Sequence, residues 1–179
     1  MAATNAPKRT VFPDSPAGRH LAKLFIASSV ISIVSVALSL IIFGNSSLFI
    51  IPAAFGLTVI HHITIRCLLA RKSTSPGEIP ANSPADSRFN CLRHGANFYV
   101  LLFFALVWLA GGILSIVINA LNFGWTDNTY ITALDLVSAC LAVVESGILI
   151  AMAVFCRNLR GEASVELSEG TSTTNLAFG

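Results

Sequence analysis

The chain has 179 residues, of which 54% are hydrophobic and only 11% are charged, with a net charge of +2 and a mean hydropathy of +0.75. Soluble domains carry about 25% charged residues, so this composition indicates a membrane protein. The small net charge, without a basic run interleaved with aromatic residues, argues against nucleic acid as a partner.

Apolar runs along the chain are long enough to cross a bilayer, which takes about 20 residues. They cover residues 21–43, 48–69, 98–118 and 131–155. We therefore predict an all-α fold, an antiparallel four-helix bundle integral to the membrane at residues 21–156. Three polar segments lie outside these runs: the tails at residues 1–20 and 157–179, and the loop at about 71–92. Each segment is too short for a soluble catalytic domain, because about 40 residues are usually needed to fold alone.

The Lys and Arg residues predict the orientation of the bundle. All 11 lie before or at the start of the first span, around the central loop, or after the last span. Because basic loops stay cytoplasmic, we expect both termini and the central loop inside the cell. Residues 44–47 and 119–130 then lie outside.

The polar segments have compositions typical of disorder. The central loop reads STSPGEIPANSPADSRFN at Ser73–Asn90, rich in Pro and Ser and without an apolar period. The C-terminal tail places Glu residues among Ser, Thr and Gly, and we expect it to be disordered as well. Three prolines, Pro7, Pro13 and Pro16, argue against a helix in the N-terminal tail.

Small residues form stripes on three of the predicted spans. Ser28, Ser32, Ser35 and Ser39 lie on one face of the first span. The fourth span carries its own stripe, formed by Asp135, Ser138, Ala139, Ala142, Glu145, Ser146 and Ala153, and the third span has Gly111, Gly112 and Ser115. Small residues let helices approach closely, so we interpret the stripes as packing contacts, with a pore lining as the alternative for the serines.

Glu145 is the acid placed nearest the middle of the membrane, where an ionised carboxylate needs a partner or a proton. His61 and His62 lie at a similar depth and are its predicted partners if the second and fourth spans are neighbours. Structural hydrogen bonding, a proton or ion role, and ligand recognition all stay open. Asp135, about 15 Å farther outward, is expected to be hydrated near the interface.

The cysteines and Ser-Pro dipeptides suggest modification sites. Neither outer connection contains a cysteine, which excludes an outer disulfide framework. The predicted inner boundary holds Cys67, Cys91 and Cys156, which are candidates for S-palmitoylation. Proline follows Ser15, Ser75 and Ser83, which are candidates for proline-directed phosphorylation.

Four segments carry a resemblance to a known family: the Arg19–His20 entry to the first span, GNSS at 44–47, WLAGG at Trp108–Gly112 and FCRNLR at Phe155–Arg160. Over residues 19–160 the chain resembles the MARVEL-type four-span membrane proteins, including fungal plasma-membrane members. The resemblance implies membrane organisation or vesicle traffic, with association to sterol-rich domains, to other membrane proteins or to itself. It also implies the plasma membrane or secretory-pathway vesicles as the location.

Two function classes follow from these observations. The first is a non-enzymatic membrane-organising or vesicle-trafficking protein that acts through helix packing and lipid-domain association. The alternative is a small channel or proton-coupled carrier that uses Glu145 with His61 or His62. No pairing of nucleophile and base, phosphate-binding loop, zinc-type spacing or cofactor motif is present in the sequence, so we expect neither an enzyme nor a cofactor.

Overall fold

The computed structural model describes residues 11–41, 48–70, 83–121 and 129–177. These residues form α1 (Pro16–Leu40), α2 (Ile50–Leu69), a 3₁₀ turn η2 (Ser87–Phe89), α3 (Asn90–Arg93), α4 (Gly95–Leu121) and α5 (Thr129–Ala177). No strand occurs within the described ranges, which confirms the all-α prediction for them. Four helices, α1, α2, α4 and α5, are long and apolar enough to cross a membrane.

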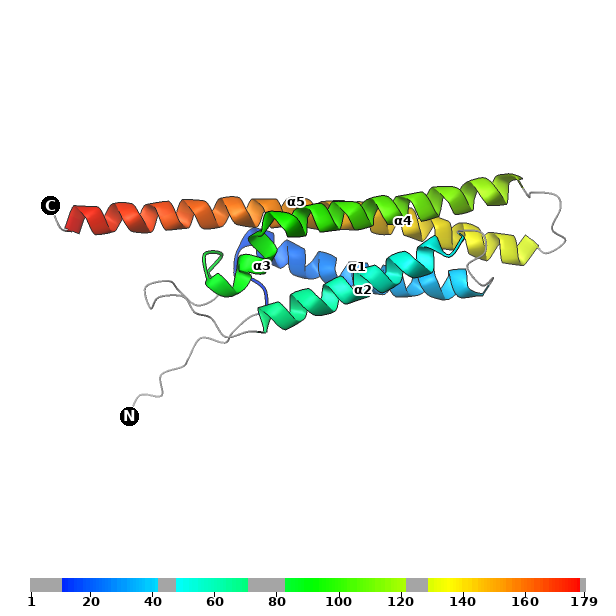
Figure 1. Ribbon diagram of the computed structural model, residues 1–179, viewed down its shortest axis with the longest axis horizontal. Coiled ribbons are helices and arrows are strands. Elements are labelled where there is room, and N and C mark those ends of the chain that lie inside the picture. The colour runs from blue at the N-terminus through cyan, green and yellow to red at the C-terminus, as the bar shows by residue number, and fades with distance from the viewer. Residues whose placement is uncertain (1–10, 42–47, 71–82, 122–128, 178–179) are drawn as a thin grey trace, which may run out of the picture.

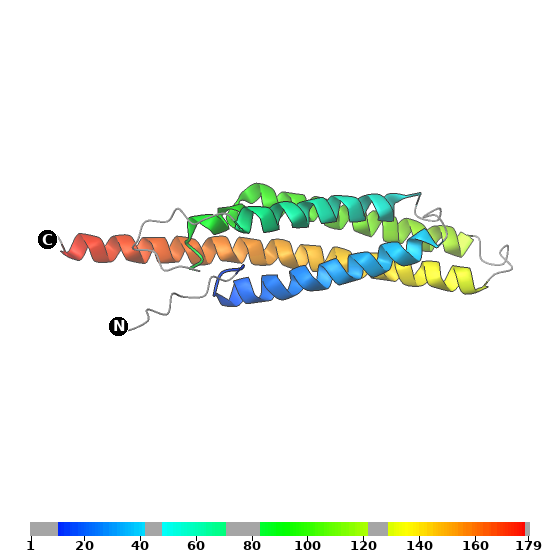
Figure 2. The same cartoon turned by 90° about the horizontal axis from the view of Figure 1, so that it is seen from below.

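The long helices lie side by side along the longest axis of the molecule (Figures 1 and 2). α5 packs mainly on α4 and α1, and α2 packs on the same two helices. α2 and α5 are therefore diagonal to each other across the bundle. This arrangement decides which polar side chains inside the bundle can meet.

The first helix begins earlier than predicted, at Pro16 rather than at residue 21. Ser15 is its N-cap, and the Ser15 Oγ accepts a hydrogen bond of 3.1 Å from the Gly18 N–H. Proline is tolerated at the first helical position because its missing N–H would have no intrahelical partner. The expectation that Pro16 prevents a helix here was wrong, because Pro16 starts one.

The C-terminal tail is helical where it was expected to be disordered. α5 continues without a break from the predicted span through Ala177. Leu159 and Ala163, which lie beyond the predicted span, are 1% and 2% exposed, so this part of α5 is packed against other residues. Tertiary packing of Leu159 and Ala163 therefore stabilises the helix just beyond the predicted span.

The end of the central loop is also ordered, which corrects the prediction of disorder up to residue 92. Residues 83–93 form a turn, η2 and α3, and Phe89 and Leu92 are 0% and 3% exposed. α3 packs on α5. The Ser83 Oγ donates a hydrogen bond of 2.6 Å to the Glu166 Oε2, and the Ala85 N–H donates to the same oxygen at 3.3 Å. Residues 71–82 lie outside the described ranges.

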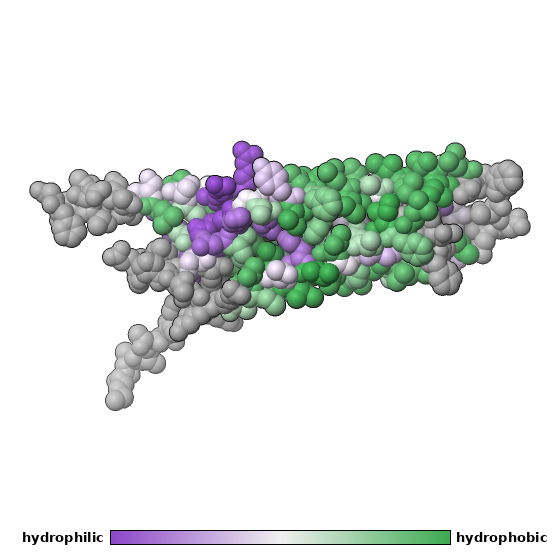
Figure 3. All heavy atoms as spheres, viewed as in Figure 1, coloured by the Kyte–Doolittle hydropathy of each residue, from purple (hydrophilic) through white to green (hydrophobic). Residues whose placement is uncertain are grey.

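Apolar side chains cover most of the surface along the long helices, whereas hydrophilic residues gather near α3 at one end (Figure 3). Ile26, Ile60, Leu106 and Val144, one from each long helix, are each at least half exposed. In water such a continuous apolar surface would be costly, so it identifies the face of the bundle that contacts lipid. Four membrane-spanning helices make this a multi-pass membrane protein.

Candidate functional site: polar side chains inside the bundle

The serine stripe of α1 lies against α5. Ser28, Ser32, Ser35 and Ser39 are all between 0% and 1% exposed. The Ser35 Oγ donates to the Ser138 carbonyl at 3.1 Å, and the Ser138 Oγ donates back to the Ser35 carbonyl at 2.8 Å. These reciprocal bonds require close approach of the two backbones, which only small side chains permit. We call this contact, from Ser28 to Ser39 on α1 and from Asp135 to Ser146 on α5, the serine seam.

Glu145 lies in the serine seam and is fully buried. The Ser28 Oγ donates a hydrogen bond of 2.5 Å to the Glu145 Oε1. The Glu145 Oε2 is buried and accepts no hydrogen bond of normal geometry among the described residues, while the Ser32 hydroxyl lies close enough to interact with the Glu145 carboxylate. The predicted pairing with His61 or His62 was wrong, because those residues are on α2, which packs on α1 and α4 and is diagonal to α5.

The two histidines take different partners. The His61 Nε2 lies 2.8 Å from the Asn97 Oδ1, an oxygen that can only accept, so the His61 Nε2 donates this bond. Asn97 in turn donates through Nδ2 to the Cys156 Sγ at 3.3 Å, which links α2, α4 and α5. The His62 Nδ1 lies 3.4 Å from the Ser29 Oγ. Sequence reasoning missed Asn97, which comes just before the predicted third span.

Asp135 is buried at 2% exposure rather than hydrated at the interface. The Ser115 Oγ donates to its Oδ2 at 3.1 Å, and the Asn119 Nδ2 donates to the same oxygen. Both donors come from α4, and Asn119 was placed by the sequence in the outer connection. α4 extends past residue 118 to Leu121 and so carries Asn119 into the bundle.

Two adjacent glycines of α4 let two different helices approach. A Cβ built on Gly111 would lie 3.0 Å from the Ile50 Cγ2 of α2. A Cβ built on Gly112 would lie 3.0 Å from the Ala139 carbonyl oxygen and 3.0 Å from the Val143 Cγ2, both on α5. Ser146, the other predicted packing residue, is 2% exposed on α5.

The centre of the bundle is filled by Trp108, which is 0% exposed. Its Nε1 donates to the Thr58 Oγ1 at 2.9 Å, so the indole N–H is satisfied inside the protein. Within the described residues, no group of three or more His, Cys, Asp or Glu side chains could hold a metal ion.

The three candidate S-palmitoylation sites differ in accessibility. Cys67 is exposed, Cys91 is half-buried and Cys156 is 3% exposed with the hydrogen bond from Asn97 on its sulfur. Burial raises the pKa of the Cys91 thiol, which lowers the fraction of reactive thiolate. Cys67 is the member of this group that the structure leaves open to an acylating enzyme.

The phosphorylation candidates that the structure describes both have structural roles. Ser15 is buried at the start of α1, where its side chain caps the helix. Ser83 is buried and donates to Glu166. Ser75 lies outside the described residues. A kinase therefore reaches Ser15 or Ser83 only after local opening of these contacts.

Comparison with known proteins gives no relative for this chain: no family model, no curated protein and no solved structure matches it. The resemblance to MARVEL-type proteins therefore stays a prediction from the sequence.

Proposed function

We propose that this protein is a non-enzymatic membrane-organising or vesicle-trafficking protein that acts through helix packing and lipid-domain association. One observation carries the proposal. The polar side chains within the spans, such as Glu145, Asp135 and Ser35, face other helices, whereas the outward faces are apolar. A bundle of this kind presents lipid-facing surface and uses its polar groups to hold its helices together.

The proposed topology is antiparallel, with both termini and the central loop in the cytoplasm. Contact pairs between helices support the antiparallel order: Ser28 meets Glu145 and Ser35 meets Ser138, so positions rise along α1 as they fall along α5. The Lys and Arg residues before and in the first two turns of α1, around the central loop and after the predicted fourth span support the orientation.

The proposed partners are the lipid bilayer, sterol-rich domains within it, and other membrane proteins or further copies of this chain. The proposed location is the plasma membrane or secretory-pathway vesicles. Exposed apolar residues of every long helix support contact with lipid or with partner helices. Cys67 supports attachment of an acyl chain at the inner boundary, because its thiol is exposed at the end of α2.

A proton-coupled carrier is the second candidate, and a set of buried atoms without described partners favours it. These atoms include the Asp135 Oδ1, Ser39 Oγ, Glu145 Oε2 and His62 Nε2. Polar atoms of this kind can bind water molecules, which could carry protons. The reciprocal bonds between Ser35 and Ser138 and the buried Trp108 ring argue for a closed bundle instead.

Two measurements on the full chain distinguish these functions. Fluorescently tagged protein in vesicles shed from the plasma membrane is expected to concentrate in the sterol-rich phase, and Cys67→Ser is expected to reduce that enrichment. Liposomes containing purified protein are expected to dissipate a pH gradient no faster than protein-free liposomes. Faster dissipation that Glu145→Gln abolishes, with no phase preference in vesicles, would replace the organising role by the carrier.

A further inference from the structure

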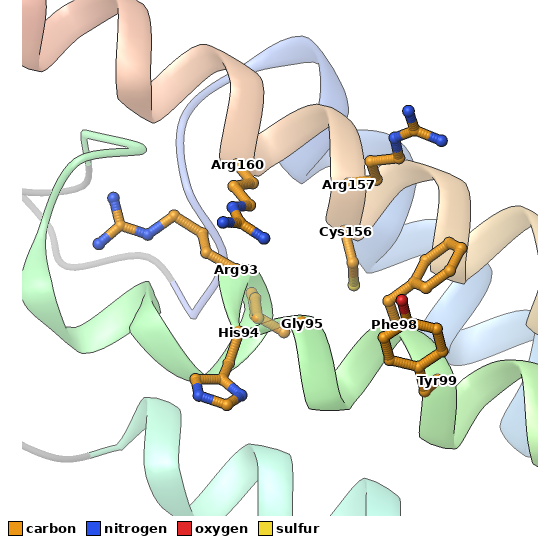
Figure 4. Close-up of a pocket in the computed structure, with 9 residues that line it drawn as sticks. Arg93, His94, Gly95, Phe98, Tyr99, Cys156, Arg157 and Arg160 are labelled. Carbon is orange, nitrogen blue, oxygen red and sulfur yellow. The ribbon is translucent and has the colours of Figure 1, made fainter.

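A cavity of about 210 Å³ lies between the junction of α3 and α4 and the facing part of α5 (Figure 4). The junction between α3 and α4 contributes Arg93 and Gly95, α4 contributes Phe98, and α5 contributes Arg160. A second cavity of about 520 Å³ adjoins it and shares Arg93, Gly95 and Arg160. The two cavities form one hollow with arginines from separate elements on its wall.

The hollow is strongly basic. Arg93, Arg157 and Arg160 line it, and no acidic residue does so among the described residues. Arg160 reaches from α5 toward the first residue of α4, since a Cβ built on Gly95 would lie 3.9 Å from the Arg160 Nη1. Figure 4 shows Arg160 pointing from α5 toward Gly95, Arg93 extending away from Gly95, and Arg157 pointing away from both arginines. Arg93 and Arg160 therefore line both cavities from separate elements.

Two acids lie near the hollow without lining it. Asp86 and Glu166 act electrostatically on Arg93 and offset part of its charge, and the Glu166 Oε2 also accepts hydrogen bonds from the Ser83 hydroxyl and the Ala85 N–H. The Arg93 side chain donates a hydrogen bond to the neutral amide of Asn90. A guanidinium bonded to a neutral amide keeps its positive charge and its remaining N–H donors for a ligand.

Part of the lining of the hollow is apolar or aromatic. Leu92 and Phe98 line it, together with Tyr99, which is 70% exposed. Phe98 packs against the hydrophobic core, and its ring lies 5.4 Å from the Tyr99 ring. Aromatic rings at this level are typical of the lipid headgroup region. A ligand that fills the hollow therefore has an anionic head at the arginines and an apolar part beside the rings.

We propose that this hollow binds the phosphate-bearing headgroup of an anionic phospholipid of the phosphoinositide class. A single arginine guanidinium can bind phosphate oxygens through two parallel N–H bonds, and the start of a long helix such as α4 adds a favourable dipole. Basic pockets between membrane helices on the cytoplasmic side are suited to such headgroups. The inference rests on the membrane-spanning bundle and orientation of the proposed function, and it does not depend on domain organisation.

Native mass spectrometry of the full chain in mild detergent tests this site. Wild-type protein titrated with phosphatidylinositol bisphosphate is expected to bind one lipid saturably and more tightly than it binds phosphatidylserine. The double variant Arg93→Gln/Arg160→Gln is expected to weaken that binding by about tenfold or more, because it removes charge-assisted bonds to the phosphates. Unchanged binding by the double variant would overturn the proposal.

The matched control is Arg19→Gln/Lys23→Gln, which removes the same charge from exposed positions on α1 outside the hollow. This control is expected to bind like the wild type, and an equal loss would mean that net charge rather than the site attracts the lipid. Soluble inositol trisphosphate is expected to bind more weakly than the lipid. Equally tight binding would identify a free phosphate site and overturn the lipid assignment.

The lipid measurement is independent of the organising role. The double variant is expected to fold, because Arg160 is exposed and Arg93 is only partly buried, and circular dichroism checks its helix content. It is also expected to keep the phase preference of the wild type in plasma-membrane vesicles. Loss of headgroup binding with retained phase preference would separate the two proposals.

Discussion

Gly112 is the residue of α4 that tolerates a side chain least at the contact with α5. A methyl group added there would lie 3.0 Å from the Ala139 carbonyl oxygen and 3.4 Å from the Ala142 Cβ. The carbonyl belongs to the backbone of α5 and cannot rotate away, so Gly112→Ala must push α4 and α5 apart by a few tenths of an ångström. At Gly111 the neighbours are the side chains of Ile50 and Ile51, which can adjust.

The free-energy change follows from two opposing terms. Alanine stabilises a helix interior by about 0.5–1 kcal/mol relative to glycine, and overpacking costs about 1–3 kcal/mol. Gly112→Ala is therefore expected to lower the free energy of unfolding by about 1 kcal/mol net. A Cβ built on Gly147 of α5 would have no atom of another residue packed within 4 Å. Gly147→Ala therefore gains the helix propensity of alanine without the overpacking cost, and it serves as the matched control.

Unfolding of the purified variants by sodium dodecyl sulfate in mild detergent, followed by circular dichroism, measures these differences. The expected order of stability is Gly147→Ala above wild type, wild type above Gly112→Ala, and Gly111→Ala between the last two. Gly112→Ala as stable as Gly147→Ala would refute the close approach of α4 and α5.

Three further predictions concern single side chains. Glu145→Gln is expected to keep the hydrogen bond from the Ser28 hydroxyl. Glu145→Leu removes the acceptor of that bond and is expected to lower the free energy of unfolding by about 1–2 kcal/mol. Equal stability of both variants in detergent would contradict this. Ser83→Ala removes a bond to Glu166 worth about 1 kcal/mol, so trypsin is expected to cut residues 83–93 about fivefold faster. Unchanged cleavage would disprove that role. Cys67→Ser is expected to abolish the mass shift in an acyl-exchange gel, and a shift that persists would place the acyl group elsewhere.

The membrane-spanning helices were predictable because their signal is local. A run of about 20 apolar residues specifies a helix in lipid whatever its neighbours are. The buried faces were predictable for a similar reason, since the period of a helix placed Ser28, Ser35, Ser138 and Glu145 on stripes that the structure buries. Each of these features depends on residues within one helix.

The errors arose where a residue far along the chain decides the outcome. Glu145 was predicted to pair with His61 or His62 because the residues lie at a similar depth in the membrane. In the structure the neighbours of α5 are α1 and α4, and the order in which helices pack cannot be derived from the pattern within each helix. The tail after residue 156 and the segment from Ser83 looked disordered because each is polar and poor in apolar periodicity. Ser83 bonds to Glu166, and Phe89 and Leu159 belong to the core of the bundle, so each segment is held by contacts that its own sequence does not reveal.

The central claim is that the serine seam is closed within the membrane, so the polar groups serve packing rather than transport. Disulfide cross-linking in intact membranes tests it, with Ser35→Cys and Ser138→Cys placed together in a cysteine-free background. This pair is expected to cross-link rapidly, because each side chain reaches the backbone of the other residue. The control pair Ile33→Cys and Val137→Cys, 56% and 50% exposed on the lipid-facing surface, is expected not to react. Failure of the seam pair to cross-link, together with labelling of Ser35→Cys by a membrane-impermeant thiol reagent, would show a water-filled path and contradict the account.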